Sequence, residues 1–456
     1  MLRLTWVQPE DLIGHELRQA AQDGRDASGA ERRWVAAGGH LAPDRAGASA
    51  TPATPELRAL AEELLDELAA EPSPLAATEP AEYRAPLPPA PAPAPAPADP
   101  DTELRRLHAA WLGRAAGCLL GKPVEKLTLT GIRAIARSTG NWPLTSWFTE
   151  VGLDPEIARE HPWNRRSRPT SLAENIDGMP EDDDLNYPLL GLLLIQRHGH
   201  DFSTEDVAKL WLDELPAGRT FTAERVAYRN LLAGLEPPHT ATYRNPFREW
   251  IGAQIRADVF GWTNPGDPAR AAELAHRDAS LTHTANGVYG EMFVAAAIAH
   301  AAGPAPTTVH ETLTAALAHI PPQSRYAQAI RFGIDTAAAE PTGTPEAFEQ
   351  VVDALHQRYG DHHWVHVLPN AALLAAALTH ADGDFAGSVC RAVSGGWDTD
   401  SNGATAGSIA GLLAGDPDVL PSSWTAPLKN RLATTVAGFD GIGFDELARL
   451  TLEARA

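Results

Sequence analysis

The sequence predicts an all-α protein in which a small helical region and a linker precede one large helical domain. Three observations lead to this prediction. Apolar residues recur at the three- and four-residue spacing of amphipathic helices through most of the chain. Alternating runs of Val, Ile and Thr, which are typical of strands, are missing. An Ala/Pro-rich segment divides the 456 residues into two unequal parts.

The first part, residues 1–70, carries two helical signals. Pro9 and two acidic residues precede the segment LIGHELRQA, and Pro55 precedes ELRALAEELLDELAA, in which the leucines have helical spacing. Proline and acidic side chains favour the first turn of a helix. A region of this size is too small for an independent core. We therefore expect it to dock on the rest of the chain or on a partner.

Residues 71–102 are predicted to form a linker. Residues 84–100 read RAPLPPAPAPAPAPADP. Repeated proline excludes a helix, because proline lacks the amide donor and clashes with the preceding turn. Such a sequence favours an extended polyproline II spacer. The acidic Ala/Pro-rich run that begins at Glu71 is assigned to the same linker.

Residues 103–456 are predicted to form one all-α domain. Its helical segments are rich in Ala and Gly, as in GEMFVAAAIAHAAG and ATAGSIAGLLAG. Small residues let two backbones approach closely, so we expect these helices to be buried in the middle of the domain.

Composition excludes several classes of function and site. The net charge of −22 argues against a nucleic-acid or anionic membrane partner, because phosphates would be repelled. Two cysteines cannot build a disulfide framework or a Cys-rich zinc site. The N-terminus lacks the pattern of a signal peptide, and the longest apolar stretches are too short to cross a bilayer. The sequence is therefore interpreted as cytoplasmic.

A first acidic cluster spans Glu181 to Asp184, ahead of the apolar run that starts at Leu189. Adjacent carboxylates repel one another at neutral pH, so a compensating charge is expected. One interpretation is a helix N-terminus, where acids offset the macrodipole. Pro188 favours the first helical position, which predicts that the acids lie in the loop before the helix.

A second acidic cluster lies in GGWDTDSNG, residues 395–403. Its acids match the first half of an EF-hand loop, but the twelfth position is Ile409 instead of Glu, so an EF-hand is rejected. Each cluster alone is explained by helix capping. Together they place hard oxygen ligands before two buried helices, where unpaired carboxylates would be costly. Mg²⁺, Mn²⁺ and Ca²⁺ prefer such sites.

Four segments, in this order from about Leu104 to the C-terminus, are similar to motifs of the ADP-ribosylglycohydrolase family. They are GRAAGCLLGKPVE, DDDLNY, IGAQIRADVFG with the later RDASLTHTANGVYGE, and GGWDTDSNGATAGSIAG. The last is the most specific. The chain departs from the family pattern at Cys118, Asp182 and Leu185, where the family has Asp, Thr and Thr.

The resemblance implies a fold, a reaction and a cofactor. The fold is a single large orthogonal helical domain, and the reaction is hydrolysis of a ribosyl glycosidic bond with two Mg²⁺ ions, for which Mn²⁺ is an alternative. The ions would hold ribose hydroxyls and lower the pKa of a bound water. Carboxylates would stabilise the oxocarbenium-like transition state or act as a general base.

Three sets of site residues follow from the matched motifs. The implied catalytic residues are Glu125, Asp183 and Asp184. The implied metal ligands are Asp182, Asp183, Asp184, Asp398, Asp400 and Ser401. The implied substrate-binding residues are Gly252, Gln254, Arg256, His283, Gly287, Tyr289 and Trp397. A shift of the first cluster by one residue toward Glu181 stays open, as does the choice between stacking on a base and packing for Trp397.

The predicted function is release of ADP-ribose from a modified protein side chain or small molecule. One alternative is hydrolysis of another N-riboside or nucleotide-derived metabolite. The other is a non-catalytic homologue that binds ADP-ribose or serves a structural role, against which the presence of both acidic clusters argues. The linkage that is cleaved and the oligomeric state are not determined by the sequence.

Overall fold

The computed structural model describes residues 2–43, 47–81, 83 and 99–455. These residues form helices and no β-strand, and their extended backbone pairs only in isolated bridges such as Trp250–His366. The predicted all-α class is therefore confirmed. Most of the predicted polyproline II spacer, at 84–98, lies outside the described residues. Among the described helices, none has both the length and the apolar character needed to cross a membrane.

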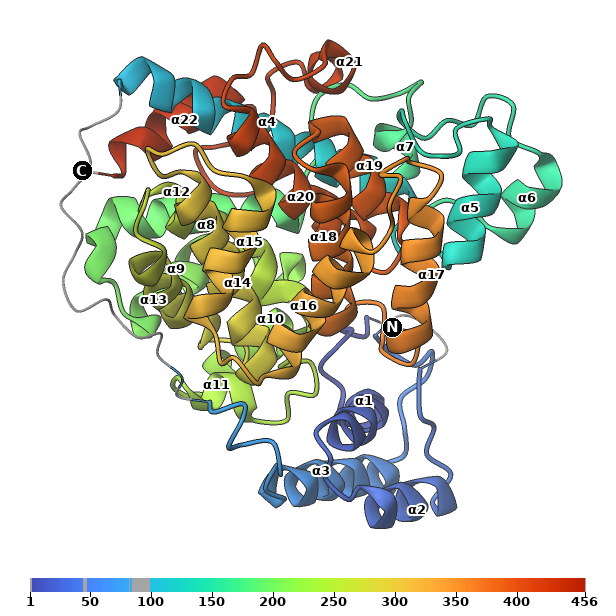
Figure 1. Cartoon of the computed structure of the whole chain (residues 1–456). Coiled ribbons are helices and arrows are strands. Elements are labelled where there is room, and N and C mark those ends of the chain that lie inside the picture. Colours follow the sequence, from blue (N-terminus) through green and yellow to red (C-terminus); the bar gives the residue numbers. More distant parts are fainter. Residues whose placement is uncertain (1, 44–46, 82, 84–98, 456) are drawn as a thin grey trace.

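Three helices of the N-terminal region lie together at one edge of the molecule (Figure 1). They are α1 (Pro9–Gln22), α2 (Ser28–Ala36) and α3 (Pro55–Ala70). Helices α1 and α3 begin at the prolines that predicted them. The sequence did not predict α2, because only two of its nine residues are buried and its apolar pattern is correspondingly sparse.

The remaining helices build the large domain. Those of its first half are α4 (Pro100–Gly121), α5 (Leu129–Ser138), α6 (Pro155–Glu160), α7 (Arg168–Ser171), α8 (Asp183–His198), α9 (Thr204–Glu214), α10 (Thr222–Leu232), α11 (His239–Thr242), α12 (Asp258–Trp262), α13 (Pro268–Ala279) and α14 (Ala285–Ala301). Those of its second half are α15 (Val309–Ala316), α16 (Arg325–Ala338), α17 (Phe348–Tyr359), α18 (Val367–Ala381), α19 (Phe385–Ser394), α20 (Thr399–Ala414), α21 (Ser422–Thr425) and α22 (Phe444–Glu453). Short 3₁₀ helices include η1 (Lys122–Val124), η3 (Ala217–Arg219) and η4 (Ile251–Arg256).

Helices α4 and α20 pack against each other with their backbones in close approach. A Cβ atom on Gly117 would overlap the carbonyl of Gly403, and one on Gly403 would overlap the carbonyl of Gly117. Gly121, at the end of α4, meets the backbone of Thr399 in the same way. The absence of side chains at these positions therefore brings the end of α4 and η1 directly beside the start of α20.

The N-terminal region docks on the large domain through buried ion pairs, which we call the docking network. Its carboxylates are Glu16, Asp23, Glu79 and Glu249, and its guanidinium groups are those of Arg25, Arg248 and Arg325. Arg248 lies 2.7 Å from Glu16 of α1 and 2.8 Å from Asp23, the residue that follows this helix. Glu79, within the segment predicted as a linker, lies 2.7 Å from Arg325. The region therefore has its partner within the same chain.

Candidate functional site

The first acidic cluster caps helix α8. Asp182 is the N-cap, and its Oδ1 accepts a hydrogen bond of 3.0 Å from the backbone N–H of Asp184. The expectation that the helix begins at Pro188 is wrong, because α8 begins at Asp183 and Pro188 lies inside it. Pro188 cannot donate to the carbonyl of Asp184 one turn earlier, and the Arg114 Nε donates to that carbonyl instead, at 2.7 Å.

The second acidic cluster forms the start of helix α20. Asp398 is the N-cap, and its backbone N–H donates to Asn370 Oδ1 at 3.0 Å. The hydroxyl of Thr399 donates to the carbonyl of Gly121 at 2.8 Å, which ties this helix start to the end of α4. Because residues 399–414 are helical, they do not form a calcium-binding loop, in agreement with the rejection of an EF-hand.

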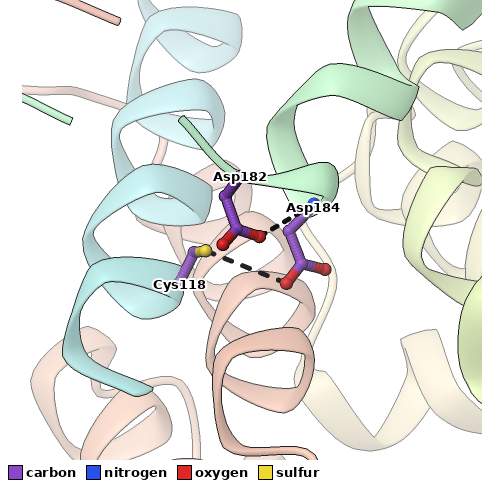
Figure 2. Close-up of side chains that lie close together, drawn as sticks. All are labelled: Cys118, Asp182 and Asp184. Atoms are coloured by element: carbon purple, nitrogen blue, oxygen red, sulfur yellow. Dashed lines mark hydrogen bonds between the residues drawn. The ribbon is translucent and has the colours of Figure 1, made fainter. Parts of the chain in front are cut away.

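The start of α8 and the start of α20 both contact the end of α4 and η1, so the two clusters lie together. Figure 2 shows Cys118 on α4 and Asp182 and Asp184 at the start of α8 pointing toward one another. Their ligand atoms lie within 4.8 Å of one another. Ser401 of α20 donates from its Oγ to Asp184 Oδ2 at 3.4 Å. We call the resulting group the acidic centre. Its carboxylates are Glu125, Asp182, Asp183, Asp184, Asp398 and Asp400.

Burial dominates the electrostatics of the acidic centre. It raises the pKa values of Asp183, Asp184 and Asp398 well above the ordinary range, and neighbouring carboxylates raise them further. Burial, with the charge of Glu125, raises the pKa of Asp400 to about 7. Neighbouring positive charges are therefore too few to keep most of these acids ionised, and a further cation is needed for that.

Asp182 behaves differently because a lysine lies against it. Burial acts to raise its pKa, but the ammonium group of Lys122, in direct contact with Oδ2, lowers it below the ordinary value. Lys122 also donates to the carbonyl of Glu181 at 3.2 Å. This lysine supplies part of the compensating charge that three adjacent carboxylates require.

The donor set of the acidic centre fits a hard divalent cation. Asp184 Oδ1 is buried and has no hydrogen-bond partner among the described residues, and Arg114 Nη2 lies 3.6 Å from it. The other donors are carboxylate and hydroxyl oxygens. Cys118 does not change this chemistry, because burial raises the pKa of its thiol well above the usual value and disfavours the thiolate that binds metal.

A cavity of about 610 Å³ opens beside the acidic centre. Carboxylates of both clusters line it, together with Glu125, and so do the cationic side chains of Lys126, Arg166 and Arg219. Glu125 is held in place by Asn164 Nδ2, which donates to Oε2 at 2.6 Å, and by Lys126, 2.9 Å from Oε1. The cavity thus offers carboxylates that can bind cations or sugar hydroxyls. It also offers cationic side chains that can bind anionic groups, although Lys126 is paired with Glu125 and Arg219 with Glu181.

The family model described as ADP-ribosylglycohydrolase matches residues 99–455. The chain belongs to the ADP-ribosylglycohydrolase family. Its assignment to this family from the four motifs is therefore confirmed. A solved structure described as "ADP-ribosylglycohydrolase-related protein complex" is 19% identical, with a TM-score of 0.43, and the alignment covers 78% of this chain and 98% of that chain. No curated protein matches. The N-terminal region and the segment that follows it lie outside the family match.

Three of the residues expected to bind substrate, Gly252, Arg256 and His283, lie next to Glu224, whose side chain lines the cavity. Gly252 lines the cavity, and a Cβ at this position would overlap the carboxylate of Glu224. Arg256 lies 3.1 Å from Glu224 on the buried side. His283 pairs through Nδ1 with the hydroxyl of Thr282 at 2.6 Å, and its Nε2 lies 3.9 Å from Glu224. Arg256 and His283 are therefore placed to act through Glu224.

The other four residues of that set pack elsewhere in the domain. Gln254 accepts a hydrogen bond from the hydroxyl of Tyr326 at 2.8 Å. Gly287 allows helix α14 to approach the carbonyl of Arg248. Tyr289 donates to the carbonyl of Pro80 at 2.6 Å, and Trp397 stacks on His356 with ring centroids 3.8 Å apart. None of these four is among the described residues that line the cavity.

Several residues that line the cavity were not predicted as site residues from the sequence. They are Thr5, Trp6, Lys122, Asn164, Arg166, Arg219, Glu224 and Trp364. Lys122 stands inside the first family motif, GRAAGCLLGKPVE, which could have marked it. Of the others, Arg219 ends η3 and Glu224 lies in the first turn of α10, and the rest lie in loops or in the N-terminal region; no motif marks any of them.

Proposed function

We propose that this chain hydrolyses the glycosidic bond of an ADP-ribosyl group on a protein side chain or small molecule and releases ADP-ribose. The observation that carries the proposal is that the two acidic clusters, more than 200 residues apart in the sequence, line one cavity. Family membership supports a glycohydrolase.

We propose two Mg²⁺ ions as the cofactor, held by oxygen ligands of the acidic centre. The proposed ligands are Asp182, Asp183, Asp184, Asp398, Asp400 and Ser401. When bound, such ions bind ribose hydroxyls and lower the pKa of a water molecule. Their charge would also relieve the repulsion that raises the pKa values of these buried acids.

Glu125 is proposed as the carboxylate that acts on the reacting sugar. Hydrogen bonds from Asn164 and Lys126 fix both of its oxygens at the cavity wall. In this position it can accept a proton from an attacking water or stabilise positive charge at the anomeric carbon. The side chains of Arg166 and Arg219 are proposed to bind the diphosphate, since guanidinium groups match phosphate oxygens in geometry and charge.

The test is hydrolysis of ADP-ribosyl-arginine and of O-linked ADP-ribosyl peptides, with and without Mg²⁺. We expect Mg²⁺-dependent release of ADP-ribose, reduced by roughly 100-fold or more in Asp398→Ala, because a ligand of the acidic centre is removed. The matched control is Asp418→Ala, whose carboxylate is 83% exposed and pairs only with Arg105 among the described residues. It should retain full activity.

Two other outcomes would change the proposal. Saturable binding of Mg²⁺ and ADP-ribose without turnover of either substrate would favour hydrolysis of a different N-riboside. Absence of metal binding in calorimetric titrations of the intact chain would contradict the cofactor and the role of the acidic centre.

A further inference from the structure

The N-terminal segment of the chain reaches the cavity, although it lies outside the residues that match the family. Thr5 and Trp6 are among the residues that line the cavity, together with the acids of both clusters. The family match begins only at residue 99. This part of the wall is therefore an addition to the family domain.

Contacts on both sides fix this segment in place. Arg225 of α10 donates from Nη1 to the hydroxyl of Thr5 at 2.5 Å and to its carbonyl at 3.4 Å. Arg229, one turn later, donates to the carbonyl of Val7 at 3.4 Å. The docking network anchors α1, which follows directly, to the same domain. The segment is thus held as part of the wall.

The indole of Trp6 is oriented by its neighbours. Its backbone N–H donates to the carbonyl of Gly47 at 2.6 Å. A Cβ on Gly47 would overlap Cδ2 and Cε2 of the indole, so the glycine backbone covers one face of the ring. The rings of Phe247 and Trp250 lie nearly perpendicular to the indole, with centroids 5.5 Å and 6.1 Å away, and the ring of His15 is tilted against it at 6.1 Å. Packing on these sides leaves Trp6 half-buried at the cavity wall.

Two other aromatic residues line the cavity, and each is already paired with a cation. The Arg225 guanidinium lies 5.4 Å from the centre of the Phe221 ring, and Lys126 Nζ lies 5.8 Å from that of Trp364. Among the described residues, no cation lies over the Trp6 ring. Of the three, Trp6 is therefore best placed to contact a flat, uncharged aromatic group.

We propose that Trp6 is a substrate-binding residue that contacts the nucleobase of the substrate. This inference rests on the proposed function, which places the ribose at the acidic centre and the diphosphate near Arg166 and Arg219. A nucleobase is then the aromatic part of the substrate that remains to be bound. Stacking of a base on an indole tolerates different bases and contributes to binding without hydrogen bonds.

The test compares ligands with and without the base. ADP-ribose and ribose 5-phosphate are titrated calorimetrically into the full chain in the presence of Mg²⁺, for the unsubstituted protein and for Trp6→Ala. We expect Trp6→Ala to weaken ADP-ribose binding by about five- to 100-fold and to leave ribose 5-phosphate binding unchanged. In turnover assays the KM should rise while kcat is maintained.

Two further variants separate base contact from local structure. Trp6→Phe keeps an aromatic ring and should restore most of the lost affinity for ADP-ribose. Leu4→Ala changes a residue of the same segment that is 52% exposed, and it should bind both ligands as the unsubstituted chain does. Equal loss of both ligands in Trp6→Ala, or an unchanged affinity for ADP-ribose, would overturn the inference. Failure of the unsubstituted chain to bind ADP-ribose would overturn the proposed function itself.

Discussion

Two buried clusters of charge in this protein differ in how their charge is balanced. In the docking network four carboxylates face three guanidinium groups, and Arg325 alone lies 2.7 Å from Glu79, 2.9 Å from Glu249 and 3.5 Å from Asp23. In the acidic centre six carboxylates face Lys122, Lys126 and Arg114, and one oxygen of Asp184 has no hydrogen-bond partner among the described residues.

The difference separates a structural cluster from a proposed binding site. Buried ions are tolerated when partners and hydrogen bonds replace the water they lose. The docking network comes closer to this condition with groups of the protein alone, although burial still raises the pKa of Glu249, and it joins the N-terminal region to the domain. In the acidic centre, partners and hydrogen bonds replace the lost water only in part. An added cation would complete it, which is the physical basis for assigning ligand binding to this cluster.

The largest effect on stability is expected from removing an arginine of the docking network. Arg325→Ala would leave the buried carboxylates of Glu79 and Glu249 without their main partner, with side chains only 3% and 4% exposed. We expect the free energy of unfolding to fall by about 3–5 kcal/mol. Chemical denaturation measures the change. As a control, Arg105→Ala removes ion pairs whose arginine is 45% exposed, and its cost should stay below about 1 kcal/mol. Equal effects of the two variants would contradict the comparison.

A smaller effect is expected when a cation is removed from the acidic centre. In Lys122→Met, Asp182 loses the ammonium group that contacts Oδ2, so its carboxylate becomes available to a metal. We expect the affinity for Mg²⁺ to rise by roughly tenfold, about 1.4 kcal/mol, as measured by calorimetric titration. Lys429→Met, which removes an exposed pair with Asp177, should leave the affinity unchanged. A weaker affinity in Lys122→Met would show that the lysine supports metal binding.

The smallest effect concerns pH. The pKa of Asp400 is raised from 3.8 to about 7 by burial and by the charges of Glu125 and Asp182. A raised carboxyl pKa means that the unfolded chain ionises first, so this residue's contribution to stability is lost as pH rises from about 4 to 7. Mg²⁺ binding requires the ionised form, so the increase in Tm on adding Mg²⁺ should grow by about 2–4 °C between pH 5 and 7.5. Thermal unfolding with Mg²⁺ or a chelator measures it. An increase that is independent of pH would contradict this assignment.

Much of the fold could be predicted because its signals are local. Prolines and acidic first turns marked the starts of α1 and α3, and the Gly- and Ala-rich segments predicted the buried helices α14 and α20. The start of α8 was predicted wrongly. Proline at position 188 is tolerated there because Arg114, 70 residues earlier in the α4 helix, satisfies the carbonyl of Asp184.

The acidic residues of the candidate site could be predicted from the sequence, but most of the side chains that surround them could not. Both acidic clusters stand out as motifs, and the structure brings them to one cavity. Lys122 contacts Asp182, which is 60 residues away in the sequence, and no periodic pattern in the sequence predicts this contact. The proposed substrate residues Gln254 and Trp397 pack in the domain core, where neighbours far away in the sequence decide which way a side chain points.

The sequence by itself determined the helical class, the family and the presence of two groups of hard oxygen ligands, because periodicity and short motifs are properties of neighbouring residues. Only the tertiary structure decided the pKa of each buried acid and which side chains line the cavity. Desolvation and Coulomb interactions depend on distances through space. Thr5, for this reason, belongs to the cavity through a hydrogen bond from Arg225, 220 residues away along the chain.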